Sequence, residues 1–218
     1  KILITGVGGI GGVNFVRALK IFKDKFFVVG IDFNKYYLEF PDVDVRVNSP
    51  RHSDPNFVKL LHELIEKYKI DFLHPHPSSE ALVVSQNLDS IKTKTLLPKP
   101  SIISTDKLKT QRILSDSGIN VAQTKIFENL NSIQTSFEEL GNGPHWIRAK
   151  SGAGGNLSLL CNDPKEVEYW MKLWILRGKA KIDDFILQQF LPGRNIAWDS
   201  FWYEGKLIAS FTRERLEY

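Results

Sequence analysis

The segment HWIRAKSGAGG, residues 145–155, is the most informative stretch of this 218-residue sequence. Its first six residues predict a strand, and Arg148 lies near the end of that strand, just before a glycine-rich loop. A cation followed by a glycine-rich hairpin can clamp a polyphosphate from both sides, because guanidinium and backbone N–H groups both bind phosphate oxygens. The alternative is purely structural: Arg148 forms an ion pair and the glycines only make a turn.

The sequence around this segment mixes helices with strands in an order that favours antiparallel pairing. Two prolines in three residues predict a linker at 97–101. Beyond it, Thr105 and Asp106 predict a helix cap. We expect helices over 105–117, 132–140 and 163–177, and strands over 122–127, 145–150, 157–161, 185–190, 196–203 and 207–211. Residues 101–218 are therefore predicted to form an α+β domain.

The first hundred residues instead alternate strands with helices. We expect strands over 2–4, 26–31, 43–47, 70–73 and 95–97, and helices over 10–21, 54–65 and 80–88. This alternation predicts an α/β domain with a parallel, doubly wound sheet, Rossmann-like in type, over residues 1–100.

Another glycine-rich loop follows the first predicted strand. It comes earlier in the chain, so we call it the first glycine loop and the loop at 151–155 the second glycine loop. Gly6, Gly8 and Gly11 stand in G-x-G-x-x-G spacing, and Asp32 ends the next strand. Such a loop can hold a phosphate at a helix N-terminus, and such an acidic residue can bind a ribose hydroxyl. An NAD(P)-dependent oxidoreductase is therefore one alternative, although no tyrosine has the lysine four residues on that short-chain dehydrogenases require. The other alternative is that the glycines only allow a tight turn and close packing.

Composition and a few single residues limit the kinds of protein and binding site that the sequence allows. Hydrophobic residues make up 42% of the chain and charged residues 25%, which is typical of a globular protein. The formal net charge of +4 suits an anionic ligand without implying nucleic acid. The single cysteine, Cys161, excludes an intrachain disulfide, and we expect it buried in a strand of a cytoplasmic protein with no membrane span. His74 and His76 could ligate a metal, or they could lie in a loop held extended by prolines.

Taken in order, these features resemble the ATP-grasp superfamily, and carbamoyl-phosphate-synthase-like members in particular. The resemblance runs from Ile2 to about Arg215 and includes the first glycine loop, the segment 145–155 and the run ILQQFLPGRN at 186–195. It implies a Rossmann-like preATP-grasp domain and then an ATP-grasp domain, with a lid subdomain at about 122–190 and the start of the last subdomain at 191–218. In such proteins the first glycine loop helps to form the acceptor-substrate site and binds no dinucleotide.

The resemblance also implies ATP-binding roles for particular residues. Lys107 and Arg148 would contact the nucleotide phosphates. Asn195 stands where the family usually has a ribose-binding glutamate, and Asp199 fits an acidic position in the next strand. The loop that closes over the triphosphate would comprise Ser151, Gly152, Ala153, Gly154 and Gly155. The hinge whose backbone recognises adenine would comprise Gln188, Gln189, Phe190 and Leu191, with Gln188 at a position where glutamate is common.

The implied reaction uses ATP and Mg²⁺ to phosphorylate a carboxylate or bicarbonate, and an amine-type nucleophile then attacks the acyl phosphate. The resemblance implies neither nucleic acid nor membrane as a partner, and it is compatible with a homodimer. We expect the ATP-grasp domain to be incomplete at its C-terminus, with the Mg²⁺ ligands beyond Tyr218. A non-catalytic nucleotide-binding protein is therefore a further alternative.

Overall fold

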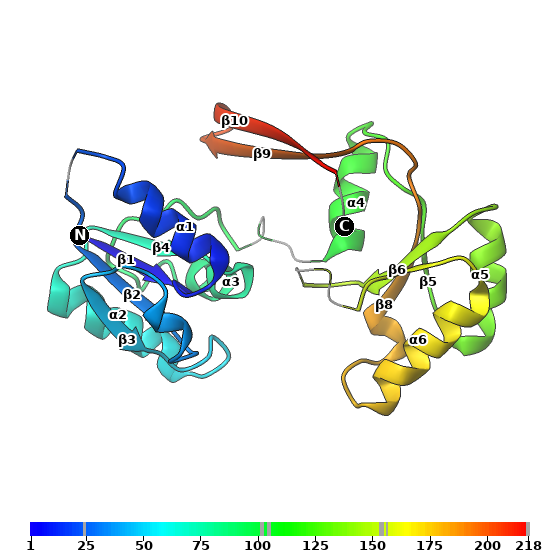
Figure 1. Ribbon diagram of the computed structural model, residues 1–218, viewed down its shortest axis with the longest axis horizontal. Helices are drawn as coiled ribbons and strands as arrows, with labels where there is room; N and C mark the ends of the chain where they lie inside the picture. Colours follow the sequence, from blue (N-terminus) through cyan, green and yellow to red (C-terminus); the bar gives the residue numbers. More distant parts are fainter. Residues whose placement is uncertain (24, 101–102, 104–105, 153–154, 156, 217–218) are drawn as a thin grey trace. The chain divides into compact units, whose positions relative to one another are not determined.

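The computed structural model describes residues 1–218 except 24, 101–102, 104–105, 153–154, 156 and 217–218 (Figure 1). Its contacts divide the chain into two compact units. Unit 1 comprises Lys1–Ser117 with Lys150–Asn156, and unit 2 comprises Gly118–Ala149 with Leu157–Tyr218. The helix after the predicted linker and the loop after Arg148 both group with unit 1, so this division differs from one drawn at residue 100. None of the described helices is long and apolar enough to cross a bilayer.

Unit 1 is built on a parallel sheet with the strand order β3-β2-β1-β4. Leu3 of β1 joins the core formed with α2 and α3, whereas its neighbours Ile2 and Ile4 join the core formed with α1. Helices therefore cover both faces, and the doubly wound sheet that the sequence predicts is confirmed (Figure 1). The elements are β1 (Ile2–Thr5), α1 (Ile10–Leu19), β2 (Val28–Asp32), a 3-10 turn (Tyr37–Glu39), β3 (Val45–Asn48), α2 (Asn56–Tyr68), β4 (Phe72–Pro75), α3 (Ser78–Gln86) and α4 (Lys107–Asp116).

The strand predicted at 95–97 is wrong. A single parallel bridge joins Lys94 to Phe72, and the chain then leaves the sheet. Two prolines follow at Pro98 and Pro100. Because proline has no N–H to donate to a ladder, the sequence around them cannot extend the pairing.

Helix α4 begins at a capped N-terminus. Asp106 Oδ1 accepts hydrogen bonds from the backbone N–H groups of Leu108 and Lys109, at 2.8 and 3.1 Å. Because alanine offers no such acceptor, we expect Asp106→Ala to lower the free energy of unfolding by about 1 kcal/mol. Asp106→Asn keeps an acceptor and should stay within about 0.5 kcal/mol of the wild type. Urea denaturation measures both variants, and equal losses would contradict the capping role.

Unit 2 is built on an antiparallel sheet with the strand order β5-β8-β6-β7. Ile147 of β6 and Leu187 of β8 are fully buried beneath Val167 and Met171 of α6. Because side chains alternate along a strand, Arg148 lies on the opposite face of the sheet. The elements are β5 (Thr124–Ile126), a 3-10 turn (Leu130–Ser132), α5 (Ile133–Glu139), β6 (His145–Ala149), β7 (Leu159–Cys161), α6 (Pro164–Leu176), a 3-10 turn (Ile182–Asp184) and β8 (Phe185–Gln189).

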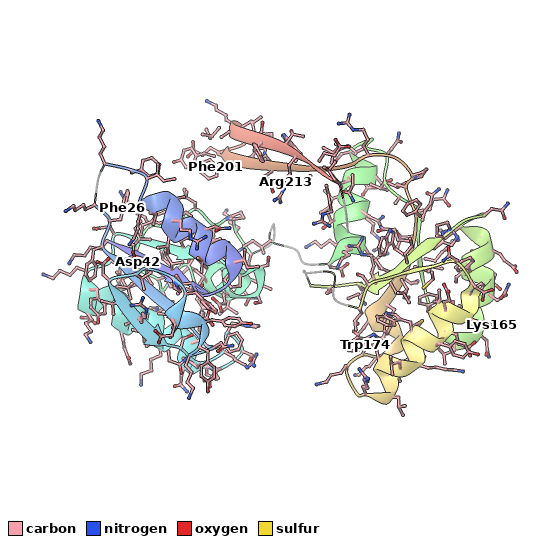
Figure 2. The ribbon with its side chains drawn as sticks, viewed as in Figure 1. Phe26, Asp42, Lys165, Trp174, Phe201 and Arg213 are labelled. Carbon is pink, nitrogen blue, oxygen red and sulfur yellow. The ribbon has the colours of Figure 1, made fainter. Side chains whose placement is uncertain are left out.

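The last two strands form a separate antiparallel hairpin, β9 (Asn195–Tyr203) with β10 (Lys206–Arg215). Glu204 and Gly205 turn it with φ of 48° and 75°, as a two-residue turn matched to strand twist requires. None of the hairpin's residues is buried, and Figure 2 shows Phe201 and Arg213 standing out from its ribbon. The predicted α+β class of this half is confirmed, and the hairpin adds no core to it.

Cys161 is fully buried in β7, as the sequence predicts. Burial raises the pKa of its thiol to about 12, so that only about one thiol in 10,000 is ionised at pH 8. We expect Cys161 in the folded chain to react with a disulfide reagent such as DTNB roughly 100-fold more slowly than in the urea-unfolded chain. Absorbance of the released thiolate measures both rates, and similar rates would contradict the burial.

Candidate functional site

The face of the unit 2 sheet opposite α5 and α6 leads into a hollow of about 330 Å³. Its lining comes from β6, from β8, from the segment that joins β8 to β9, from the start of β9 and from the chain just before β5. The lining residues are Ala122, Trp146, Arg148, Gln188, Gln189, Phe190, Leu191, Gly193, Arg194, Asn195 and Ile196. The structure therefore brings Arg148, the whole predicted hinge and Asn195 to one place.

Arg148 is held by a line of polar side chains that crosses three strands. Its Nη1 donates to Oε1 of Gln188 at 3.1 Å, and Nε2 of Gln188 donates to Oγ1 of Thr124 at 3.1 Å. Within the described part of the chain, Nε of Arg148 is buried and has no hydrogen-bond partner. An unsatisfied buried donor costs free energy. Because this atom is shielded from solvent, a ligand in the hollow would meet the guanidinium through its other N–H groups.

The hinge lies where the sheet ladder stops. The N–H of Gln189 donates to the carbonyl of Gln123 at 2.8 Å, and β8 ends at this residue. Phe190 and Leu191 continue along the wall of the hollow beyond the last strand pairing. Backbone groups in such a position can pair with the edge of a planar base, because the neighbouring strands no longer engage them.

Among the described residues that line the hollow are two arginines and no acidic side chain. Arg194 is already engaged, because its Nε and Nη2 donate to the two carboxylate oxygens of Glu214, both at 2.8 Å. Arg148, in contrast, has the neutral amide of Gln188 as its hydrogen-bond acceptor. The positive charge of Arg148 is therefore the dominant charge at this site.

Lys107 and the second glycine loop lie together in unit 1. The N–H of Lys107 donates to the carbonyl of Lys150, and its Nζ donates to the carbonyl of Gly152, both at 2.9 Å. Gly152 and Gly155 have φ of 92° and 68°, and a Cβ added to either would meet no atom within 4 Å. These glycines are therefore required by their backbone conformation and not by crowding. The predicted residues Ala153 and Gly154 lie outside the described residues.

The first glycine loop is packed by its own chain. A Cβ on Gly6 would lie 2.2 Å from Cγ of Pro77, and one on Gly11 would lie 2.0 Å from Nε2 of His76. A Cβ on Gly8 would lie 2.4 Å from the carbonyl oxygen of Tyr37. These contacts are too close for any larger side chain, so they account for all three glycines without a bound phosphate.

Asp32 is likewise engaged within the loop. Its Oδ2 accepts from the N–H of Gly8 at 3.1 Å and its Oδ1 from the N–H of Asn34 at 2.9 Å. Glu80 of α3 is also buried, and desolvation, aided by the negative charge of Asp32, raises the pKa of its carboxyl. Both acidic groups thus help to pack the carboxyl edge of the unit 1 sheet.

The two histidines that could ligate a metal are packed against rings instead. His74 stacks on Phe15, with ring centroids 4.1 Å apart, and burial lowers the pKa of its imidazole. His76 covers Gly11. Asp199 faces Arg213, with Oδ2 3.3 Å from Nε. Across the described residues, no group of three or more His, Cys, Asp or Glu side chains could hold a metal ion, so the described part of the chain offers no Mg²⁺ cluster.

Sequence reasoning missed Trp146, Arg194 and Thr124. Trp146 lines the hollow, whereas Trp170 and Trp174 pack on the core of unit 2. The period-2 alternation of β6 places Trp146 on the same face as Arg148, and this signal would have found it. Thr124 has no such signal, because its partner Gln188 is 64 residues away.

Comparison with solved structures identifies the fold. N5-carboxyaminoimidazole synthetase from Staphylococcus aureus, complexed with ADP, aligns with 100% of this chain, and the alignment covers 55% of the synthetase chain. The sequence identity is 18% and the TM-score is 0.72. L-amino acid ligase from Bacillus licheniformis matches 98% of this chain over 50% of its own, with 14% identity and a TM-score of 0.70. A third similar structure is the biotin carboxylase domain of Hydrogenobacter thermophilus 2-oxoglutarate carboxylase, complexed with MgADP, ADP and bicarbonate. The alignment covers 91% of this chain and 46% of the other chain, with 15% identity and a TM-score of 0.63.

No protein-family model matches the sequence, and no curated protein matches it either. At 14–18% identity the solved structures share the fold with this chain and say nothing of its substrate. The chain spans about half the length of each of these relatives. The chain therefore has the ATP-grasp fold over the half of these structures that it matches, with a parallel Rossmann-like sheet followed by an antiparallel α+β region.

Proposed function

We propose that this chain binds ATP in the unit 2 hollow, as part of a ligase that phosphorylates a carboxylate or bicarbonate and couples the acyl phosphate to an amine-type nucleophile. The observation that carries the proposal is the convergence of Arg148, the hinge 188–191 and Asn195 on one hollow, whose described lining residues include no carboxylate. A cation beside exposed backbone groups suits a ligand with a planar base at one end and phosphates at the other.

Different residues of the hollow would bind the phosphates, the base and the ribose of the nucleotide. Arg148 would contact a phosphate oxygen through its guanidinium, whose Nη1 is already oriented by Gln188. Phe190 and Leu191 would bind the base through their backbone, and the amide of Asn195 would bind a ribose hydroxyl. Lys107 donates from Nζ to the carbonyl of Gly152 within unit 1 and is not a lining residue of the hollow, so its phosphate contact stays a prediction from the resemblance.

Positioning and charge neutralisation are the main contributions that a protein makes to phosphoryl transfer. Mg²⁺, when bound, would offset the negative charge of the phosphates. The described residues assemble no ligand cluster for it, so we assign no residue of the chain to the metal. The acceptor carboxylate and the nucleophile are likewise assigned to no residue.

The two other functions are separated from this one by specific observations. An NAD(P)-dependent oxidoreductase would need the first glycine loop for its cofactor. In this chain the loop glycines instead pack closely against the side chains of Pro77 and His76 and the backbone of Tyr37. A non-catalytic nucleotide-binding protein would use the same hollow. The lack of an acidic ligand cluster among the described residues favours it as the second candidate.

Calorimetric titration of ATP and of NADH, each with Mg²⁺, tests the binding. We expect sub-millimolar affinity for ATP and no measurable heat with NADH, and the reverse order would refute the proposed site. The ligase step is tested separately, by phosphate release from ATP in the presence of bicarbonate or small carboxylates. ATP binding without any phosphate release across these acceptors would favour the non-catalytic candidate.

A further inference from the structure

Unit 1 has a hollow of its own at the amino edge of its sheet. Its lining comes from the last turns of α2, from the residues that lead into β4 and from the segment after α3. The first glycine loop follows the carboxyl end of β1, which runs parallel to β4, so it lies at the other edge of the sheet. The volume of this hollow is about 610 Å³, which is larger than that of the unit 2 hollow and within the range of small-molecule sites.

The walls of the unit 1 hollow are tied to each other. Ser90 Oγ lies 3.3 Å from Nε2 of His62, which joins the segment after α3 to α2. Thr93 Oγ1 donates to the carbonyl of Ile70 at 2.8 Å. Ile65 and Ile70, which are 9% and 6% exposed, belong to the core of the unit and provide the apolar part of the lining. The hollow is therefore preformed and partly apolar.

Lys69 lines this hollow in a backbone conformation that is strained for any residue with a Cβ. It ends α2 with φ of 53° and ψ of 60°, in the left-handed region. Just beyond the ends of α4, α5 and α6 the left-handed residue is a glycine, namely Gly118, Gly141 and Gly178. Strained residues of this kind cluster at functional sites, so the lysine points to a use for its side chain in the hollow.

Charges of both signs line the hollow without pairing. Within the described part of the chain, the side chains of Glu66, Lys69 and Lys92 form no ion pair or hydrogen bond. The remaining charged side chain of the lining, Asp71, is engaged, because its Oδ2 accepts from the N-terminal ammonium of Lys1 at 2.6 Å. Glu66 also stands in the last turn of α2, where the helix dipole favours a cation. The hollow thus offers two cations to an anionic group and one carboxylate to a cationic group.

We infer that the unit 1 hollow binds a small zwitterion with an apolar body, of the class of a free α-amino acid with an aliphatic side chain. The ligand's carboxylate pairs with Lys69 and Lys92, and its ammonium pairs with Glu66. Its side chain packs on Ile65 and Ile70. The inference does not rest on the proposed function, since these residues belong to unit 1 and none of them lines the unit 2 hollow.

The class of ligand is tested by calorimetry with three probes that share one apolar body. L-leucine carries both charges, 4-methylpentanoate lacks the ammonium, and 3-methylbutylamine lacks the carboxylate. We expect the wild type to bind leucine at least tenfold more tightly than either of the other probes, because only leucine can use both signs of charge. Leucine binding no tighter than a probe with a single charge, or no measurable heat with leucine, would overturn the inference.

Lys69→Gly separates the charge of the lysine from its backbone strain. Glycine adopts the left-handed conformation without strain, so the variant should melt at the temperature of the wild type or higher. It should still weaken leucine and 4-methylpentanoate at least fivefold, without weakening 3-methylbutylamine. Lys92→Ala should change the three affinities in the same way. Its matched control is Lys94→Ala, an exposed lysine that is not among the lining residues, and this control should change each affinity less than twofold.

The carboxylate is tested by the complementary pair of variants. Glu66→Gln should weaken leucine and 3-methylbutylamine at least fivefold, without weakening 4-methylpentanoate. Glu63→Gln, on the same helix, is the control, because Glu63 faces Lys59 and is not among the lining residues. If the lining variants weaken leucine no more than their controls do, leucine binds elsewhere and the assignment of this hollow is overturned.

Discussion

Arg148→Ala is expected to weaken ATP binding by roughly 1.5–3 kcal/mol, which is about 10- to 150-fold in the dissociation constant. Among the described lining residues of the unit 2 hollow, the guanidinium is the one cation whose hydrogen-bond acceptor is neutral. Alanine removes its charge and the N–H groups that would contact the phosphates. Isothermal titration with Mg·ATP measures the loss.

Arg194→Ala is the matched control for this prediction. Arg194 lines the same hollow, but both arms of its guanidinium are engaged by Glu214. Its loss should therefore weaken ATP binding less than about fivefold, since an exposed pair of this kind contributes little to its surroundings. An effect larger than that of Arg148→Ala would show that Arg194, and not Arg148, makes the phosphate contact.

Gly8→Ala is expected to destabilise unit 1 by about 3 kcal/mol. The added Cβ would lie 2.4 Å from the backbone oxygen of Tyr37 and 2.5 Å from its carbonyl carbon, and backbone cannot move aside as the end of a flexible side chain can. Any shift of the loop also breaks the hydrogen bond from the N–H of Gly8 to Asp32. Urea denaturation followed by circular dichroism measures the change.

Gly9→Ala, one residue away, is the control. The nearest atom to its added Cβ is the carbonyl oxygen of Gly6 at 3.5 Å, an ordinary contact, and the φ of Gly9 is −68°. We expect the free energy of unfolding to change by less than about 1 kcal/mol. Similar losses at the two positions would show that the loop is not packed as described.

Much of the fold was predictable because it depends on local patterns. The alternation of strands and helices in the first hundred residues predicted a parallel sheet, and the sheet is parallel. Asp106 and Asp163, each followed by a helical run, predicted helix starts, and both side chains accept from backbone N–H groups of the first turn. Periodicity and capping act over a few residues, so the sequence displays them directly.

The candidate site was predictable only in part. Arg148, the hinge and Asn195 were assigned from a resemblance in order and spacing, and the structure gathers them at one hollow. The roles assigned to them stay predictions until nucleotide binding is measured. The strand predicted at 95–97 failed because Pro98 and Pro100 end the pairing after the single bridge from Lys94 to Phe72 at the edge of the sheet.

The sequence by itself determined which residues alternate along each strand, where helices begin and that two loops are rich in glycine. Only the tertiary structure decided what those residues meet. It packed the first glycine loop against Pro77, His76 and Tyr37, and it joined Gln188 to Arg148 and to Thr124 across separations of 40 and 64 residues. The physical reason is that backbone periodicity fixes the face on which a side chain lies, whereas the burial of apolar surface by the whole chain selects the strand beside it.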